Sequence, residues 1–205
     1  MSSTMYRQFF WGLSNGIVVL AVAGGFFFGA GAVSLRTGWL QMAGIAVTVI
    51  CVASLLAGSR RIRKKADGFR MADLKTGSPE QRALARKLGV FFRWIILAEW
   101  TAFGSVSFLC HHFGADELTA PLIGLVISLH FAPLARLFRL PAYYATALLG
   151  SAFAILSIAL PAARLPVLGF GLGATMWSTA TDSILRATTL AANWHDGPAT
   201  AQGVQ

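Results

Sequence analysis

Two ionisable side chains, Glu99 and His130, lie within long apolar stretches of the sequence, where a charge is costly. The midpoint between the two positions falls between Gly114 and Ala115, in a short connection. If two antiparallel helices meet there, both residues lie at the same depth, about 20 Å from the turn. Burial would disfavour the charged forms and mutual attraction would favour them, so the pair could share one proton. The spacing therefore predicts a proton- or ion-handling pair.

Two neighbours extend this candidate site. Pro133 has no backbone N–H to donate to the carbonyl of Leu129, and that carbonyl beside His130 would suit an ion or a water molecule. Asn15 could line the same polar cavity or hydrogen-bond to another helix. A structural alternative stays open, in which Glu99 and His130 bond only to each other or to nearby hydroxyl groups and lock two helices together.

An acidic residue also lies near the end of the last apolar stretch. Asp182 is followed one helical turn later by Arg186, and Arg136 or Arg139 could lie nearby. This pattern predicts an ion pair at the membrane surface.

Three consecutive residues, Cys110, His111 and His112, are of types that ligate zinc or copper. Consecutive helical residues point in different directions, and neither C-x-x-C nor H-x-x-x-H spacing is present, so interfacial histidines are the alternative interpretation. No nucleophile elbow or histidine-containing helix motif accompanies the many Ser and Thr residues. We therefore expect no catalytic residue and no cofactor.

The elements that would position these residues are helices in lipid. Of the 205 residues, 56% are hydrophobic and only 12% are charged, against about 25% charged in soluble domains. A helix needs about 20 apolar residues to cross a bilayer, and its backbone groups pair within the segment. The apolar stretches predict six membrane-spanning helices, at 8–35, 39–58, 89–112, 119–138, 142–160 and 166–187. We expect an all-α integral membrane protein with one membrane domain over residues 1–187.

Lys and Arg residues are concentrated on one side of the six expected helices. The segment 59–88 contains ten basic and three acidic residues, whereas only Arg36 and Arg164 fall on the opposite side. Connections near span ends retain positive charge in the cytoplasm during insertion. We therefore expect a basic cytoplasmic loop at 59–88 and cytoplasmic N and C termini, with 188–205 as a loose tail.

The basic segment also suggests partners. It has no zinc-ligand spacing or interleaved aromatic residues, so we expect no nucleic-acid binding. Anionic lipid headgroups would be attracted to it. Small residues at Gly12 and Gly16, and at Ala21, Gly25 and Gly29, recur at intervals of four and predict a flat surface for helix packing, against this chain's own helices or a partner subunit. Cys51 and Cys110 are expected at different depths and should not pair.

One short segment resembles a known group of proteins. The run from His130 to Pro141, His-Phe-Ala-Pro-Leu-Ala-Arg-Leu-Phe-Arg-Leu-Pro, followed by Tyr143 and Tyr144, is similar to a family of small bacterial multi-pass membrane proteins of unknown activity. The resemblance implies a compact helical bundle in a bacterial inner membrane, and it implies no activity, cofactor or site residue.

Two classes of function follow from these observations. The first is a proton- or ion-linked carrier of a small solute, in which Glu99 and His130 handle the proton. The second is a non-enzymatic accessory or assembly subunit of a membrane complex, or a homo-oligomer, in which the same pair is structural. The external connections are too short to form a receptor domain, so the activity is expected within the membrane or at its cytoplasmic surface.

Overall fold

The described part of the chain folds into six long helices, and each runs antiparallel to the helix before it in the sequence. The computed structural model describes residues 3–67, 79–138 and 140–195, and within these ranges no strand occurs. The α-helices are α1 (Ser3–Val33), α2 (Gly38–Asp67), α3 (Pro79–His112), α4 (Thr119–Phe138), α5 (Pro141–Ala159) and α6 (Arg164–His195). Two short 3-10 turns, η2 (Asp116–Leu118) and η3 (Pro161–Ala163), precede α4 and α6. The expected all-α class and the number of helices are confirmed.

Helices α2, α3 and α6 extend well beyond the apolar stretches that predicted them. Most of the described part of the basic segment is helical, because α2 continues to Asp67 and α3 already begins at Pro79. The expected cytoplasmic loop at 59–88 is therefore helical over 59–67 and 79–88, and 68–78 lie outside the described residues. Likewise, α6 continues to His195, so the expected loose tail is wrong for 188–195. Hydropathy identifies only the apolar part of a helix. The polar sequences that follow or precede that part in α2, α3 and α6 are also helical.

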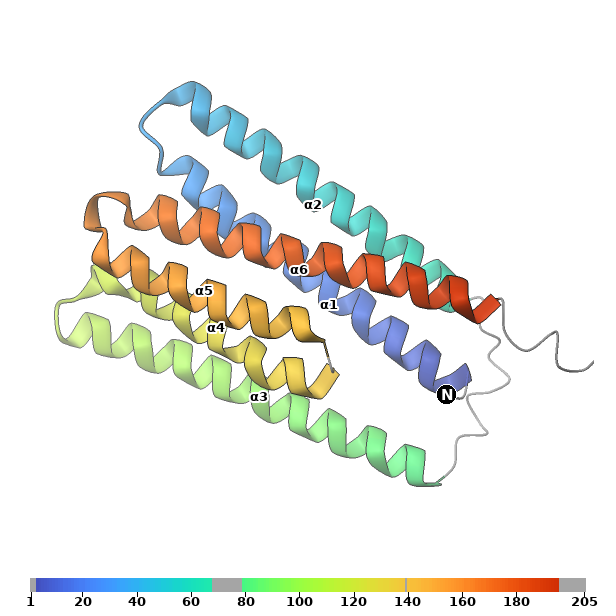
Figure 1. Cartoon of the computed structure of the whole chain (residues 1–205). Helices are drawn as coiled ribbons and strands as arrows, with labels where there is room; N and C mark the ends of the chain where they lie inside the picture. Colours follow the sequence, from blue (N-terminus) through green and yellow to red (C-terminus); the bar gives the residue numbers. More distant parts are fainter. Residues whose placement is uncertain (1–2, 68–78, 139, 196–205) are drawn as a thin grey trace, which may run out of the picture.

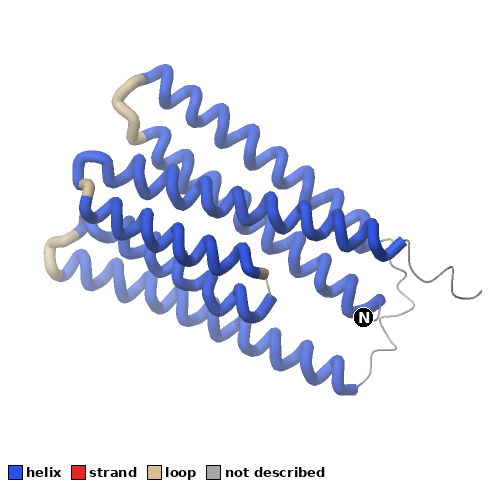
Figure 2. The backbone as a smooth tube through the Cα atoms, in the orientation of Figure 1, coloured by secondary structure: helices blue, strands red, loops and turns tan. Residues whose placement is uncertain are grey.

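The two ends of the bundle differ in their connections (Figures 1 and 2). The starts of α1 and α3 and the ends of α2 and α6 lie at one end, together with the basic residues that α2 and α3 carry there. The connections 34–37, 113–118 and 160–163 lie at the other end. The helices α4 and α5 are shorter, with 20 and 19 residues, and their connection near Leu140 lies closer to the middle of the bundle.

Helix α1 lies between α2 and α6 and makes its most extensive contacts with these two. Helix α5 joins this group to α4, and α3 packs at the edge, against α4 and the η2 turn. Because α3 has so few neighbours, most of its apolar surface is exposed.

Glycines allow the backbones of α1 and α6 to approach closely. A Cβ atom added at Gly173 would lie 2.8 Å from the carbonyl oxygen of Gly24, and one at Gly169 would lie 2.6 Å from the backbone nitrogen of Gly31. On α1, the predicted small-residue surface is divided between partners, because Gly25 faces Val52 of α2 while Gly16 faces Tyr143 of α5. Gly24, which faces α6, was not part of that prediction. Small residues at such contacts allow the van der Waals packing that holds helices together in lipid.

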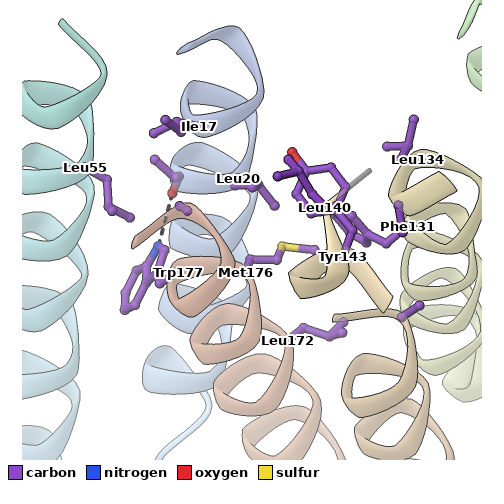
Figure 3. Packing of buried hydrophobic residues seen from close by; sticks show 14 of the residues in the cluster. Ile17, Leu20, Leu55, Phe131, Leu134, Leu140, Tyr143, Leu172, Met176 and Trp177 are labelled. Atoms are coloured by element: carbon purple, nitrogen blue, oxygen red, sulfur yellow. Dashed lines mark hydrogen bonds between the residues drawn. The ribbon is translucent and has the colours of Figure 1, made fainter. Parts of the chain in front are cut away.

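The core lies where α1, α4, α5 and α6 meet (Figure 3). Ile17 and Leu20 of α1 and Leu172 and Met176 of α6 are almost fully buried. Beside them, the indole N–H of Trp177 donates a hydrogen bond to the carbonyl oxygen of Ala21 at 3.3 Å, so the buried indole is satisfied by the backbone of α1.

Four of the helices are long and apolar enough to cross a membrane. The qualifying segments are Gly12–Val33, Gly38–Lys64, Asp116–Leu137 and Pro141–Ala159. Helix α3 includes Arg93 and Glu99, and α6 includes Asp182 and Arg186, which lower the apolar character of those two helices. These four apolar helices indicate that the chain is a membrane protein.

Candidate proton-handling site

A tight turn at the connection between α3 and α4 sets the register of the two helices. Gly114 has a positive φ of 66°, which glycine adopts without steric cost. The N–H of Ala115 bonds to the carbonyl of Cys110 at 2.8 Å, and the N–H of Gly114 bonds to that of His111 at 3.2 Å. These two bonds form a Schellman motif, which ends α3. The chain then reverses through η2 into α4.

This register brings Glu99 and His130 together. The Nδ1 atom of His130 lies 2.9 Å from Oε2 of Glu99, and the two side chains are 12% and 17% exposed, respectively. The distance is that of an ion pair, but the direction of the Nδ1–H bond does not align with the carboxylate as a hydrogen bond requires. Within the described part of the chain, neither side chain makes another polar contact.

Two aromatic rings lie between the pair and α5. The ring of Phe131 lies edge-on to His130 and also edge-on to Tyr143, with ring centroids 5.7 Å and 5.6 Å apart. Helix α4 continues through Pro133, which leaves the Leu129 carbonyl without its usual donor, and the Leu129 side chain is 55% exposed. The arrangement places a carboxylate and an imidazole, two groups that can each bind a proton, in contact at a largely buried position.

Asn15 lies in a different polar cluster, between α1 and α2. Its Oδ1 accepts a hydrogen bond from Nη2 of Arg63 at 2.9 Å. One residue earlier, the hydroxyl groups of Ser14 and Ser59 lie 2.8 Å apart, and both side chains are buried. Asn15 therefore links α1 to α2, whereas Glu99 and His130 link α3 to α4.

The Ser14–Ser59 contact was missed from the sequence although a usable signal was present. The midpoint of positions 14 and 59 falls in the connection 34–37, so the two serines are equidistant from it. The equal spacing that pairs Glu99 with His130 also pairs these serines, but Ser59 was expected in the basic segment, beyond the end of the second apolar stretch.

The three candidate metal ligands lie apart from one another at the C-terminal end of α3. Cys110 is buried, whereas His111 and His112 are exposed. His111 lies 3.3 Å from Asp116, and the ring of His112 stacks on that of Phe108. Across the described residues, no group of three or more His, Cys, Asp or Glu side chains is placed to hold a metal ion.

The remaining charged candidates lie on the surface. Arg186 Nε lies 2.6 Å from Asp182 Oδ2, one turn apart on α6, and both side chains are partly exposed. Arg136 is exposed and takes no part in this pair, and Arg139 lies outside the described residues. Cys51 and Cys110 are both free thiols, as expected.

Comparisons with known proteins add no assignment to this site. No family model matches the chain, and searches of curated proteins and of solved structures give no match either. The function must therefore be argued from the geometry alone.

Proposed function

We propose that this chain is a six-span membrane protein that carries a small solute in exchange for, or together with, a proton or ion. In this proposal the N and C termini and the basic segment lie in the cytoplasm of a bacterial cell, and the bilayer is the inner membrane. The distribution of Lys and Arg supports the orientation, since the basic residues of α2 and α3 gather at one end of the bundle. The resemblance of 130–144 supports the bacterial location.

The contact between Glu99 and His130 carries the carrier proposal. Glu99 is 13 residues from the end of α3 at His112, so the pair lies about 20 Å from that end and near the bilayer centre. An ionisable pair at this depth is expensive unless it has a use. With no further polar partner among the described residues, the pair can change its protonation without breaking a wider hydrogen-bond network.

The position of α3 suggests how protonation could be coupled to movement. Helix α3 is packed mainly against α4, and Glu99–His130 is an ionic link between these two helices. Protonation of Glu99 would remove the attraction, and a helix with few other neighbours is free to shift. A solute path beside α3 would then open and close with the proton.

Purified protein in liposomes tests this proposal. Vesicles are loaded with a pH-sensitive dye and given a pH gradient, and amino acids, sugars and monovalent cations are added one at a time. We expect at least one solute to produce protein-dependent proton movement, which Glu99→Gln abolishes. The matched control is Asp182→Asn, which removes an exposed carboxylate and should leave the movement intact. Transport by Glu99→Gln at the wild-type rate would contradict the role of Glu99.

A second candidate, an accessory subunit, is favoured by the exposed surface of α3. Trp94, Trp100 and Phe108 are 64%, 68% and 69% exposed, and large aromatic residues are typical of interface anchors. If this surface binds a partner, the protein should co-purify from native membranes with a stoichiometric subunit. Substitution of Trp100 by Ala should then release that subunit and leave the helical content unchanged.

A further inference from the structure

A shallow apolar groove follows the junction of α1 and α2. Its volume is about 380 Å³, and it is lined by Val22, Gly25, Thr48, Val49, Val52, Ala53 and Leu56. Val22 and Val49 are 55% and 62% exposed, so the groove opens on the outside of the bundle. From Thr48 to Leu56 it extends about 12 Å along the middle of α2, and it ends toward the basic end of that helix.

Basic residues continue the α2 wall of this groove. Residues four and seven apart share a face of a helix, and Arg60 follows Leu56 by four positions and Ala53 by seven. Arg60 therefore lies about 6 Å beyond the last groove residue along the helix axis. It is exposed, and among the residues that the structure describes no acidic side chain pairs with it.

The α1 wall ends in a polar contact at the same level. Asn15 precedes Val22 by seven residues, which places both on one face of α1. Because Asn15 accepts a hydrogen bond from Nη2 of Arg63 at 2.9 Å, the guanidinium of Arg63 is held between the two helices. Two guanidinium groups thus lie at the basic end of an otherwise apolar groove.

We propose that this groove binds an anionic phospholipid of the inner leaflet. One acyl chain lies along Val49, Ala53 and Leu56, and the lipid phosphate lies against Arg60 and Arg63. Guanidinium groups donate paired hydrogen bonds to phosphate oxygens, and the groove wall offers only apolar contact and one threonine to the chain. The inference rests on the orientation proposed above, which places Arg60 at the cytoplasmic headgroup level.

Lipid titration followed by native mass spectrometry tests this site on the full chain. Delipidated protein is titrated with dioleoyl phosphatidylglycerol and, in parallel, with dioleoyl phosphatidylcholine. We expect wild-type protein to bind one phosphatidylglycerol molecule more tightly than phosphatidylcholine. Arg60→Gln should weaken phosphatidylglycerol binding about fivefold, the effect of one basic residue near an anionic surface, and Arg60→Lys should retain most of it. Glycerol 3-phosphate should not compete, because it has no acyl chain.

The matched controls distinguish a specific lipid-binding site from non-specific attraction of anionic lipids to a basic helix. Arg61→Gln removes the same charge one residue along, on a different face of α2, and should leave the preference unchanged. Ala53→Phe should fill the groove and weaken both lipids, whereas Ala43→Phe, an exposed alanine outside the groove, should not. Equal losses in the Arg60 and Arg61 variants, wild-type binding by Ala53→Phe, or competition by glycerol 3-phosphate would each overturn the proposal.

The binding measurement is independent of transport. If lipid binding is lost and proton movement is intact, only the lipid site is contradicted. If proton movement is absent and lipid binding is intact, only the carrier proposal is contradicted. Circular dichroism and gel filtration of each variant show that it is folded, and the surface variants at Arg60 and Arg61 are the ones expected to fold without difficulty.

Discussion

At the residue scale, we expect the Glu99–His130 contact to contribute measurably to the free energy of unfolding. Both side chains are largely buried and each has the other as its polar partner in the described part of the chain. Glu99→Gln and His130→Gln should each destabilise the protein, because each leaves a buried group without its partner. In a double-mutant cycle we expect a coupling free energy of about 1–3 kcal/mol from unfolding in detergent. Purely additive losses would mean that the two side chains do not interact.

The buried serine pair between α1 and α2 gives a second prediction at this scale. Ser59→Ala removes a hydroxyl that donates to the Ser14 carbonyl oxygen at 3.0 Å, and should cost about 1 kcal/mol of unfolding free energy. The double variant Ser14→Ala, Ser59→Ala should lose less than the sum of the single losses, because no buried hydroxyl is left without its partner.

The control for the serine pair is an exposed serine on the same helix. Ser54→Ala should change the unfolding free energy by less than about 0.5 kcal/mol. A loss in Ser54→Ala as large as that in Ser59→Ala would show that the pair makes no special contribution.

At the element scale, the contact between α1 and α6 depends on positions that have no side chain. A Cβ atom at Gly173 would lie 2.6 Å from Cβ of Phe28, so Gly173→Ala must move one helix. We expect a loss of about 1–3 kcal/mol, measured as a lower thermal midpoint in detergent. Gly104 on α3 has no atom within 4 Å of an added Cβ, so Gly104→Ala should be neutral or stabilising. Equal effects of the two substitutions would contradict the close approach.

Helix number and register could be predicted from the sequence, and helix ends and neighbours could not. Apolar length located all six helices, and equal spacing from the Gly114 turn located the Glu99–His130 contact. The polar ends of α2 and α6 were missed because hydropathy depends on the side chains and not on backbone hydrogen bonding, whereas the proline at position 79 correctly predicts the start of α3. Of the two alternatives for Asn15, the structure has the hydrogen bond to another helix, and span depth could not choose between them because it does not tell which helices are adjacent.

At the scale of the whole molecule, the orientation in the membrane can be tested by cysteine labelling. In a background with Cys51→Ala and Cys110→Ala, Phe113→Cys should react with a membrane-impermeant maleimide in intact cells, because Phe113 is 75% exposed at the outer connection. Arg61→Cys, exposed near the basic end, should react only after the cells are lysed. Labelling of Arg61→Cys in intact cells would reverse the proposed topology, and with it the leaflet assigned to the lipid.

The glycine contact between α1 and α6 joins segments from opposite ends of the polypeptide, and this has a consequence for biogenesis. A nascent chain emerges from the ribosome with α1 first, so Gly24 and Gly31 wait beside lipid until α6 has been translated and inserted. A chaperone or insertase that shields this surface of α1 would act during that interval, and a stalled chain that lacks α6 would present it to membrane proteases.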